Sequence, residues 1–169
     1  MTSSGRSLDE ILSEENNYYK LAQKAKAKST GEPAENLLPV YTASKLHHAP
    51  MWVRLMEEWP EINFTARWPH LHVNSLGLPR WPEDSPAHGQ LFWEHDVQDV
   101  SYASVVLCYA ERTEVLRGAL VEAGMALGQG KHVIVVGENE SYGTWQYHRN
   151  VLRVKDLSSA RNLLHLLSC

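Results

Sequence analysis

The sequence predicts a three-layer α/β domain built on a doubly wound, flavodoxin-like or Rossmann-like parallel sheet of about five strands. Short apolar runs alternate with segments of helical length and pattern between residues 37 and 168, and this alternation is typical of βαβ units. Two runs, residues 104–110 and 132–137, are almost continuously apolar. Such runs are expected of parallel strands that are buried on both faces.

The composition excludes several classes of protein. The chain has 169 residues, of which 43% are hydrophobic and 21% charged, which is ordinary for one globular domain. A net charge of −4 argues against a general nucleic-acid binder, which carries a basic excess. The cysteines Cys108 and Cys169 form no disulfide framework, so we expect a reducing compartment and a buried Cys108 thiol. Without a membrane-length apolar run or a signal-peptide core, we expect a cytoplasmic protein with no membrane partner.

The first 36 residues are polar and end in Gly, Pro and Asn. Ser7 and Glu10 have the spacing of a capping box at a helix start. We therefore expect an N-terminal helical extension and linker over residues 1–36, and the α/β domain over residues 37–169.

The first half of the domain contains two predicted strands and one helix. Residues 37–44 are apolar and β-branched and predict the first strand. Residues 47–59 predict a helix in which Pro50 is tolerated near the start, and residues 62–68 predict the second strand. The stretch 69–89 is irregular and rich in Pro, His and Trp; a loop of this length is usually functional or a lid.

The second half repeats the alternation. We expect a helix over residues 90–103, the third strand over 104–110, and a helix over 114–130 that ends in glycines. The fourth strand covers residues 132–137 and the fifth 151–154. A final helix over 156–168 is capped by Asp156 or Ser158. Because ligands bind at the carboxyl ends of such strands, four segments are expected around one crevice: residues 41–44, 68–89, 109–118 and 137–145.

Glu122 is the most informative residue of this arrangement. It lies one turn into a helix whose other residues around it are apolar. One interpretation is an acid that is stabilised by the helix dipole. The other is a functional carboxylate, because a glutamate is rarely buried without a partner or a purpose.

Two further residues are candidates. Asp96 and Asp99 share one face of their helix, either as an acidic first turn or as a site. Tyr41 lies near the end of the first strand, where its hydroxyl can reach the crevice. The histidines show no metal-ligand spacing, and no phosphate-binding loop or nucleophile elbow is present, so we predict no metal and no cofactor.

Three segments resemble the nucleoside 2-deoxyribosyltransferase-like superfamily, which includes deoxyribosyltransferases and deoxynucleoside monophosphate N-glycosidases. They are "VYTAS", "EHDVQDVSYASVVLCYA" and "RGALVEAGMALGQGKHVIVVG". The last is similar to the signature G-x-x-x-E-x-G-x-A-x-x-x-G-K-x-V. The resemblance implies that Glu122 is the catalytic nucleophile, that Asp96 is the acid/base group, and that Tyr41 holds the glutamate or the substrate.

The resemblance also points to substrate-binding residues. The position six before Glu122 is Asp or Ser in many members but Leu116 in this chain, and the family's Ala-Asp pair is Ala103-Ser104. Arg112, Thr113 or Arg117 are candidates to replace the lost contact, which suits an anionic substrate. Further candidates lie in the turn after Tyr41, at the glycine that lets the backbone approach a ligand, and at two tryptophans that suit base stacking. The predicted binding residues are Ser44, Trp68, Arg112, Arg117, Gly118 and Trp145.

We therefore expect cleavage or transfer at the N-glycosidic bond of a nucleoside or nucleotide, since a carboxylate stabilises an oxocarbenium-like transition state or traps it covalently. One alternative is a TIR-like NAD-cleaving enzyme, which also uses a glutamate near a helix start. Another is a non-catalytic nucleotide-binding module. Members of the family commonly build the site at a dimer interface, so a homodimer is expected, with a small-molecule nucleoside or nucleotide as the partner and no nucleic acid.

Overall fold

The computed structural model describes residues 36–68 and 86–168. The chain divides into two units, Met1–Leu37 and Leu38–Cys169, and the α/β architecture belongs to the second. The predicted N-terminal helix and linker, nearly all of the predicted loop at 69–89, and Cys169 lie outside the described residues. Pro86 to Gly89, which the sequence predicts to be loop, belong to a helix.

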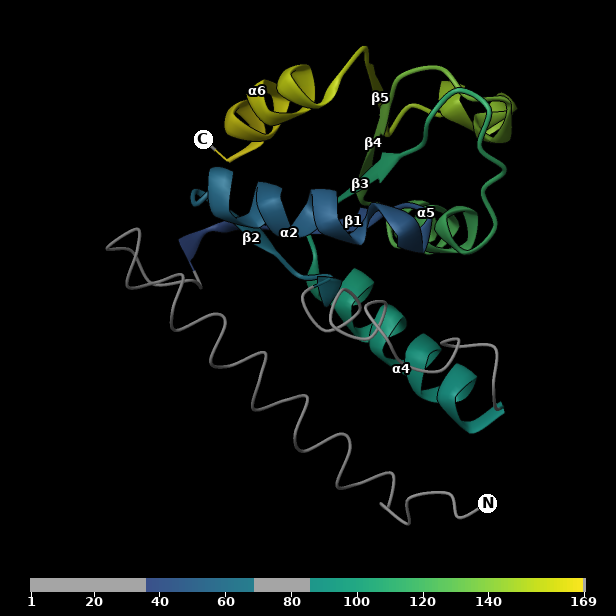
Figure 1. The fold of residues 1–169 in the computed structure, drawn as a ribbon. Coiled ribbons are helices and arrows are strands. Elements are labelled where there is room, and N and C mark those ends of the chain that lie inside the picture. The colour runs from purple at the N-terminus through teal and green to yellow at the C-terminus, as the bar shows by residue number, and fades with distance from the viewer. Residues whose placement is uncertain (1–35, 69–85, 169) are drawn as a thin grey trace. The chain divides into compact units, whose positions relative to one another are not determined.

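The second unit is built on a five-stranded sheet in which every neighbouring pair is parallel (Figure 1). The strand order is β2-β1-β3-β4-β5, the flavodoxin-like order, so the predicted fold class is confirmed. The order in which the chain adds strands to the sheet changes direction between β1 and β3. Ligands bind at this point in sheets of this type. The strands are β1 (Leu38–Ala43), β2 (Ile62–Phe64), β3 (Val105–Tyr109), β4 (His132–Val136) and β5 (Val151–Val154).

Helices cover both faces of this sheet, which makes three layers (Figure 1). The helices α4 (Pro86–Tyr102) and α5 (Gly118–Gly128) pack against each other and against β1. The helices α2 (Ala49–Glu58) and α6 (Leu157–Leu167) lie on the other face. There Arg161 of α6 forms a bidentate ion pair with Glu61, beyond the end of α2, at 2.7 and 3.1 Å.

The central strands form the core because their side chains are apolar on both faces. The buried residues of β3 and β4 are, with few exceptions, valine, leucine and isoleucine, whose branched side chains suit a pleated surface. On β1, Tyr41 and Thr42 are buried with a polar group each, and Tyr41 carries its hydroxyl into the layer between the sheet and the helices α4 and α5. Within the described ranges, no helix is both long and apolar enough to cross a membrane.

Several element boundaries differ from the prediction, among them those of β2 and α4. The strand β2 ends at Phe64 and not at Trp68, because Arg67 forms a bidentate ion pair with Asp99 at 2.9 and 3.2 Å and Trp68 turns into the core. The helix α4 begins at Pro86 and not at Gln90. Asp96 therefore lies in the interior of α4, and the interpretation of an acidic first turn is wrong for this residue.

The helix α5 also begins later than predicted, at Gly118 and not at Glu114. The Asn139 side-chain amide donates hydrogen bonds to the backbone carbonyls of Glu111 and Glu114, at 2.7 and 2.8 Å. These two hydrogen bonds fix the backbone from Glu111 to Glu114 against Asn139, outside the helix. The segment before Gly118 is a loop that is held in place by hydrogen bonds from Asn139.

Candidate active site

Three side chains from three elements meet in the layer between the sheet and its helices. The Tyr41 hydroxyl lies 2.9 Å from Oε1 of Glu122 and 3.0 Å from Oδ1 of Asp96. Tyr41 comes from β1, Asp96 from α4 and Glu122 from α5. The structure thus brings together the three residues for which a catalytic role is predicted.

All three residues are buried, with 4% of Tyr41, 8% of Asp96 and 6% of Glu122 exposed. A solvated acid at the start of a helix would be exposed, so the dipole interpretation does not account for Glu122. Two buried carboxyl groups close together cannot both ionise without a large cost, because each desolvates and repels the other.

The hydrogen bonds set the number of protons at this site. A phenol has one O–H, so it donates to one carboxylate at a time. A second short oxygen–oxygen contact is favourable when the other group is a protonated carboxyl that donates to the phenol oxygen. Because Tyr41 contacts both Glu122 and Asp96, the geometry favours one ionised and one protonated carboxyl group.

The electrostatics agree with this count. The pKa of Asp96 is raised to about 7, because burial and the Asp99 charge outweigh the hydrogen bonds with Tyr41 and Glu122 and the Arg67 charge, which lower it. Burial and the Asp96 charge hold the pKa of Glu122 well above its usual range, against the hydrogen bond from Tyr41. The pair titrates as a unit.

Two neighbours of the pair have structural roles. The Arg67–Asp99 ion pair links the segment after β2 to α4 one turn beyond Asp96.

Cys108 of β3 is a buried free cysteine, as predicted. Burial together with the Glu122 charge keeps the pKa of its thiol well above the usual range. A thiol held neutral in this way is a poor nucleophile. The second oxygen of Asp96 has no hydrogen-bond partner among the described residues.

The predicted binding residues fall into different surroundings. Ser44 accepts a hydrogen bond from the Trp52 indole at 2.8 Å and donates to the Lys45 carbonyl. Trp68 is 4% exposed, stacks on Trp52 and donates to Thr42. Both side chains therefore contribute to packing around β1, and Trp68 presents no open face for a nucleobase.

Gly118 and Trp145 also lie against protein groups. A Cβ at Gly118 would contact the Trp93 ring at 3.5 Å, so this glycine lies beside a tryptophan of α4. Trp145 donates to the Ser141 carbonyl at 3.3 Å and packs edge-on against Tyr142. Arg117 is exposed at the N-cap of α5, where its side chain makes no capping bond.

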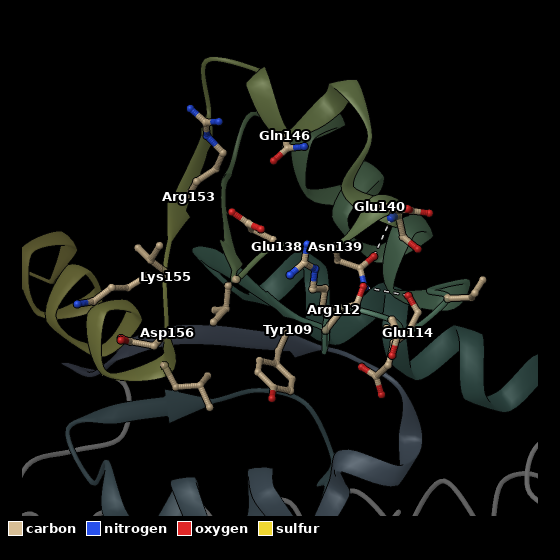
Figure 2. A pocket seen from close by; sticks show the side chains of 18 of the residues that line it. Tyr109, Arg112, Glu114, Glu138, Asn139, Glu140, Gln146, Arg153, Lys155 and Asp156 are labelled. Atoms are coloured by element: carbon tan, nitrogen blue, oxygen red, sulfur yellow. Dashed lines mark hydrogen bonds between the residues drawn. The ribbon is translucent and has the colours of Figure 1, made fainter.

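A groove of about 1590 Å³ opens at the carboxyl ends of β3, β4 and β5 (Figure 2). Arg112, Arg153 and Lys155 line it together with Glu138 and Asp156, so its charge is mixed. Of the predicted binding residues, Arg112 lines this groove, whereas Ser44, Trp68, Arg117, Gly118 and Trp145 do not. The segments after β3 and β4 that were expected around the crevice do contribute to it.

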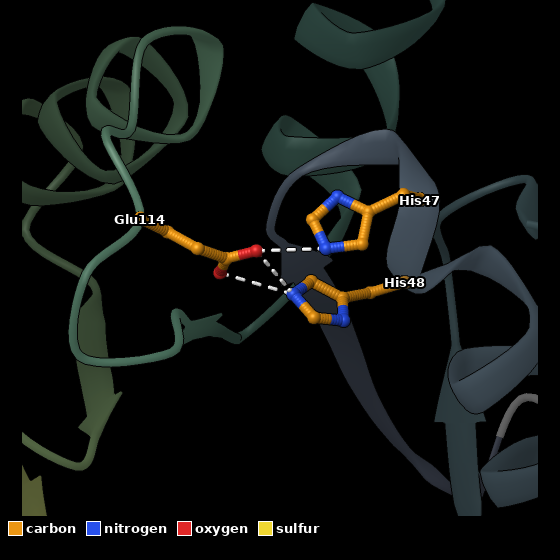
Figure 3. Close-up of side chains that lie close together, drawn as sticks. All are labelled: His47, His48 and Glu114. Carbon is orange, nitrogen blue, oxygen red and sulfur yellow. Dashed lines mark hydrogen bonds and ion pairs between the residues drawn. The ribbon is translucent and has the colours of Figure 1, made fainter.

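A second polar cluster joins the segments that follow β1 and β3 (Figure 3). Nε2 of His47 lies 2.8 Å from Oε1 of Glu114, and Nε2 of His48 lies 2.8 and 3.0 Å from the two oxygens of the same carboxylate. Burial raises the pKa of Glu114, but the bonds from His48 and the Glu111 amide, with the two histidines' charges, hold it below its usual value.

Sequence reasoning missed this second cluster and Asn139. The available signal was positional: a His-His pair follows the first strand, a glutamate follows the third, and neighbouring parallel strands end at the same edge of a sheet. Comparisons with protein-family models, with curated proteins and with solved structures return no match to this chain. What the site does is therefore argued from its own side chains.

Proposed function

We propose that the protein cleaves or transfers at the N-glycosidic bond of a nucleoside or nucleotide, with Glu122 as the nucleophile and Asp96 as the acid/base group. The observation that carries the proposal is the Tyr41 hydroxyl within 2.9 and 3.0 Å of two buried carboxyl groups. The resemblance to the nucleoside 2-deoxyribosyltransferase-like superfamily supports it, since the same three residues match that family's pattern.

Each side chain has a role in this chemistry. The Glu122 carboxylate attacks the anomeric carbon, a carbon–oxygen bond forms, and the carbon–nitrogen bond to the base breaks. The protonated Asp96 gives its proton to the departing base. Water, or a second base, then attacks the same carbon and releases Glu122, and Asp96 takes a proton from this attacking group. The first alternative is hydrolysis and the second is transfer.

The shared proton fits these roles. One ionised and one protonated carboxyl group are required before the reaction, which is the state that the Tyr41 contacts favour. In the free protein burial raises the pKa of both acids. Positive charge that develops on the sugar ring lowers the pKa of the nearer carboxyl group. A substrate seated with its anomeric carbon against Glu122 therefore favours ionisation of Glu122 and leaves the proton on Asp96.

One observation favours the alternative of a non-catalytic nucleotide-binding module. Leu116, where many family members have a polar substrate contact, is 3% exposed and packs in the core. Its amide donates to Ser141 at 3.1 Å, which fixes this position as part of the scaffold. A phosphate contact must then come from another residue, such as Arg112 at the groove.

The test is release of free base from a panel of ribonucleosides, deoxyribonucleosides, their monophosphates and NAD, followed by chromatography with and without an added second base. Wild type should release base from at least one class, and Glu122→Gln should not. Glu57→Gln, which changes an exposed glutamate on α2, is the matched control and should behave as wild type. Ligand-induced thermal stabilisation without any turnover would instead establish the binding module, and base release only from NAD would establish the TIR-like alternative.

A further inference from the structure

The cluster that joins the ends of β1 and β3 has the composition of a metal site. We propose that His47, His48 and Glu114 bind a divalent transition-metal ion, with Zn²⁺ as the representative ion. The site shares no residue with the Tyr41, Asp96 and Glu122 group, so it is independent of the proposed glycosidic chemistry.

The geometry brings three donors to one point. One ligand atom from each residue lies within 4.8 Å of the other two, and this is the one such group of three or more found in the described residues. Figure 3 shows both imidazoles directing Nε2 at the same carboxylate. With bonds of about 2.0–2.1 Å, ligand atoms around a tetrahedral zinc are about 3.3 Å apart. The 2.8 and 3.0 Å contacts need to open by only a few tenths of an ångström to admit the ion.

Two of the three donors are held in place before any ion arrives. The side chains of His48 and Glu114 are each 8% exposed. The ring of His48 lies edge-on to Tyr109, with centroids 5.0 Å apart, and its other neighbour is the His47 ring at 4.0 Å. Preorganisation of this kind raises the affinity of a metal site, because fewer groups must be ordered on binding.

The carboxylate has its own supporting bonds. Its Oε2 accepts a hydrogen bond from the Glu111 amide at 2.8 Å. The Asn139 side chain holds the backbone of the same turn through the carbonyls of Glu111 and Glu114. Hydrogen bonds to a ligating carboxylate and its backbone are what orients the ligands of protein metal sites.

The donor types select the ion. Two neutral imidazoles and one carboxylate suit Zn²⁺, Co²⁺ or Ni²⁺, whereas Mg²⁺ and Ca²⁺ require oxygen ligands. Three protein ligands leave a fourth position for water or another oxygen donor. Glu114 and Tyr109 also line the groove, so the ion would lie at the edge of that groove.

The experiment is calorimetric titration of Zn²⁺ into the full chain after treatment with EDTA and its removal, with Co²⁺ absorption spectra to report the coordination. Wild type should bind at micromolar or tighter affinity, with the intense visible bands of tetrahedral Co²⁺. His47→Ala and Glu114→Gln should each weaken binding at least tenfold. His47 is the safer variant for folding, since its side chain is 60% exposed. His165→Ala is the matched control: His165 pairs with Glu61 at 3.1 Å and should leave binding unchanged.

Two results would overturn the proposal. Undiminished Zn²⁺ binding by both His47→Ala and Glu114→Gln would place the metal at other histidines of the chain. An absence of binding by wild type at 100-micromolar Zn²⁺ and neutral pH would show that the cluster is only a histidine–carboxylate ion pair. A circular dichroism spectrum of each variant establishes that a loss of binding is not a loss of fold.

Discussion

Glu122 and Glu114 lie eight positions apart in the sequence, and their surroundings shift the pKa values of the two carboxyl groups in opposite directions. Both side chains are largely withdrawn from water. The pKa of Glu122 is raised by burial and by a second acid, whereas the pKa of Glu114 is lowered by histidines and an amide that outweigh its burial. Burial alone therefore does not decide the charge of a carboxyl group; its nearest partners do.

The difference separates two kinds of chemistry. The buried pair of Glu122 and Asp96 favours one retained proton, which the proposed reaction needs on Asp96 as the general acid. At Glu114 the carboxylate is held in its ionised form, as a metal ligand or an ion-pair partner requires. Glu122 and Glu114 thus offer a comparison within one chain, and four measurements test it.

The largest expected effect is on turnover. Glu122→Gln should lower the rate of base release on the order of 10³-fold or more, because an amide cannot replace an attacking carboxylate. Glu114→Gln should leave that rate within about threefold of wild type, since the contacts of Glu114 are with His47, His48 and Glu111 and not with the Glu122 site. Single-turnover rates of the two variants on the best substrate make the comparison, and equal losses in both would contradict the division of roles.

The second effect concerns stability and pH. The raised pKa of Asp96, about 7, means that the folded protein holds this proton more tightly than the unfolded chain does. The free energy of unfolding should therefore fall as pH rises from about 4 to about 7 and stay low above that range. Asp96→Asn removes the ionisable group and should stabilise the protein at pH 8 by about 2 kcal/mol, and by much less at pH 4.

Urea denaturation of Asp96→Asn at pH 4, 6 and 8 measures this dependence. Glu57→Gln, which changes an exposed acid, is the control and should show the pH profile of wild type. A stabilisation by Asp96→Asn that is the same at every pH would mean that Asp96 does not hold a proton in the folded state.

A smaller effect is expected at the loop that positions Glu114. Asn139→Ala removes the amide that holds the carbonyls of Glu111 and Glu114. Because two carbonyls in partly buried hydrogen bonds would lose their partner, the free energy of unfolding should drop by about 1–3 kcal/mol. Hydrogen exchange should increase at the amides of Glu111 and Glu114 and not in β3. Uniformly faster exchange through the sheet would show that Asn139 supports the whole domain and not this loop.

The smallest effect is the stability change at the second glutamate. Since its pKa is lowered, ionised Glu114 contributes stability that is present above the pKa of the unfolded chain, near 4.5, and is lost as pH falls through the lower folded value. Glu114→Gln should cost about 1 kcal/mol at pH 7 and almost nothing at pH 3. Thermal melts at the two pH values test the sign, which is opposite to that of Asp96→Asn.

The sheet was predictable from sequence because apolar runs that must be buried on both faces leave few alternatives. Residues 104–110 and 132–137 are of this type, and β3 and β4 lie within them. The prediction failed at the start of α5. The periodic pattern continues back to Glu114, but the Asn139 amide holds the backbone there through the carbonyls of Glu111 and Glu114, and these contacts join residues 28 and 25 positions apart.

The part of the candidate site that was predictable consists of residues that are unusual in their own segment or match a family pattern. Glu122 is a carboxylate in an apolar helix, and the order of Tyr41, Asp96 and Glu122 along the chain matches a family pattern. The His47, His48 and Glu114 cluster gives no such sign, because each of its residues is ordinary in its own segment. Ser44 and Trp68 lie in segments that were expected around the crevice. In the structure Ser44 is hydrogen-bonded to Trp52 and Trp68 to Thr42, and the sequence gives no sign of these contacts.

The contacts of Tyr41 also bear on how the chain reaches its native state. They join β1 to residues 55 and 81 positions further along the chain. Contacts between distant residues form after much of the loop entropy has been lost, so they arise late relative to local helices. We expect Asp96 and Glu122 to remain solvated acids until α5 has docked on the sheet. Because the pKa of both acids is raised in the native state, folding at neutral pH is expected to be accompanied by uptake of a proton.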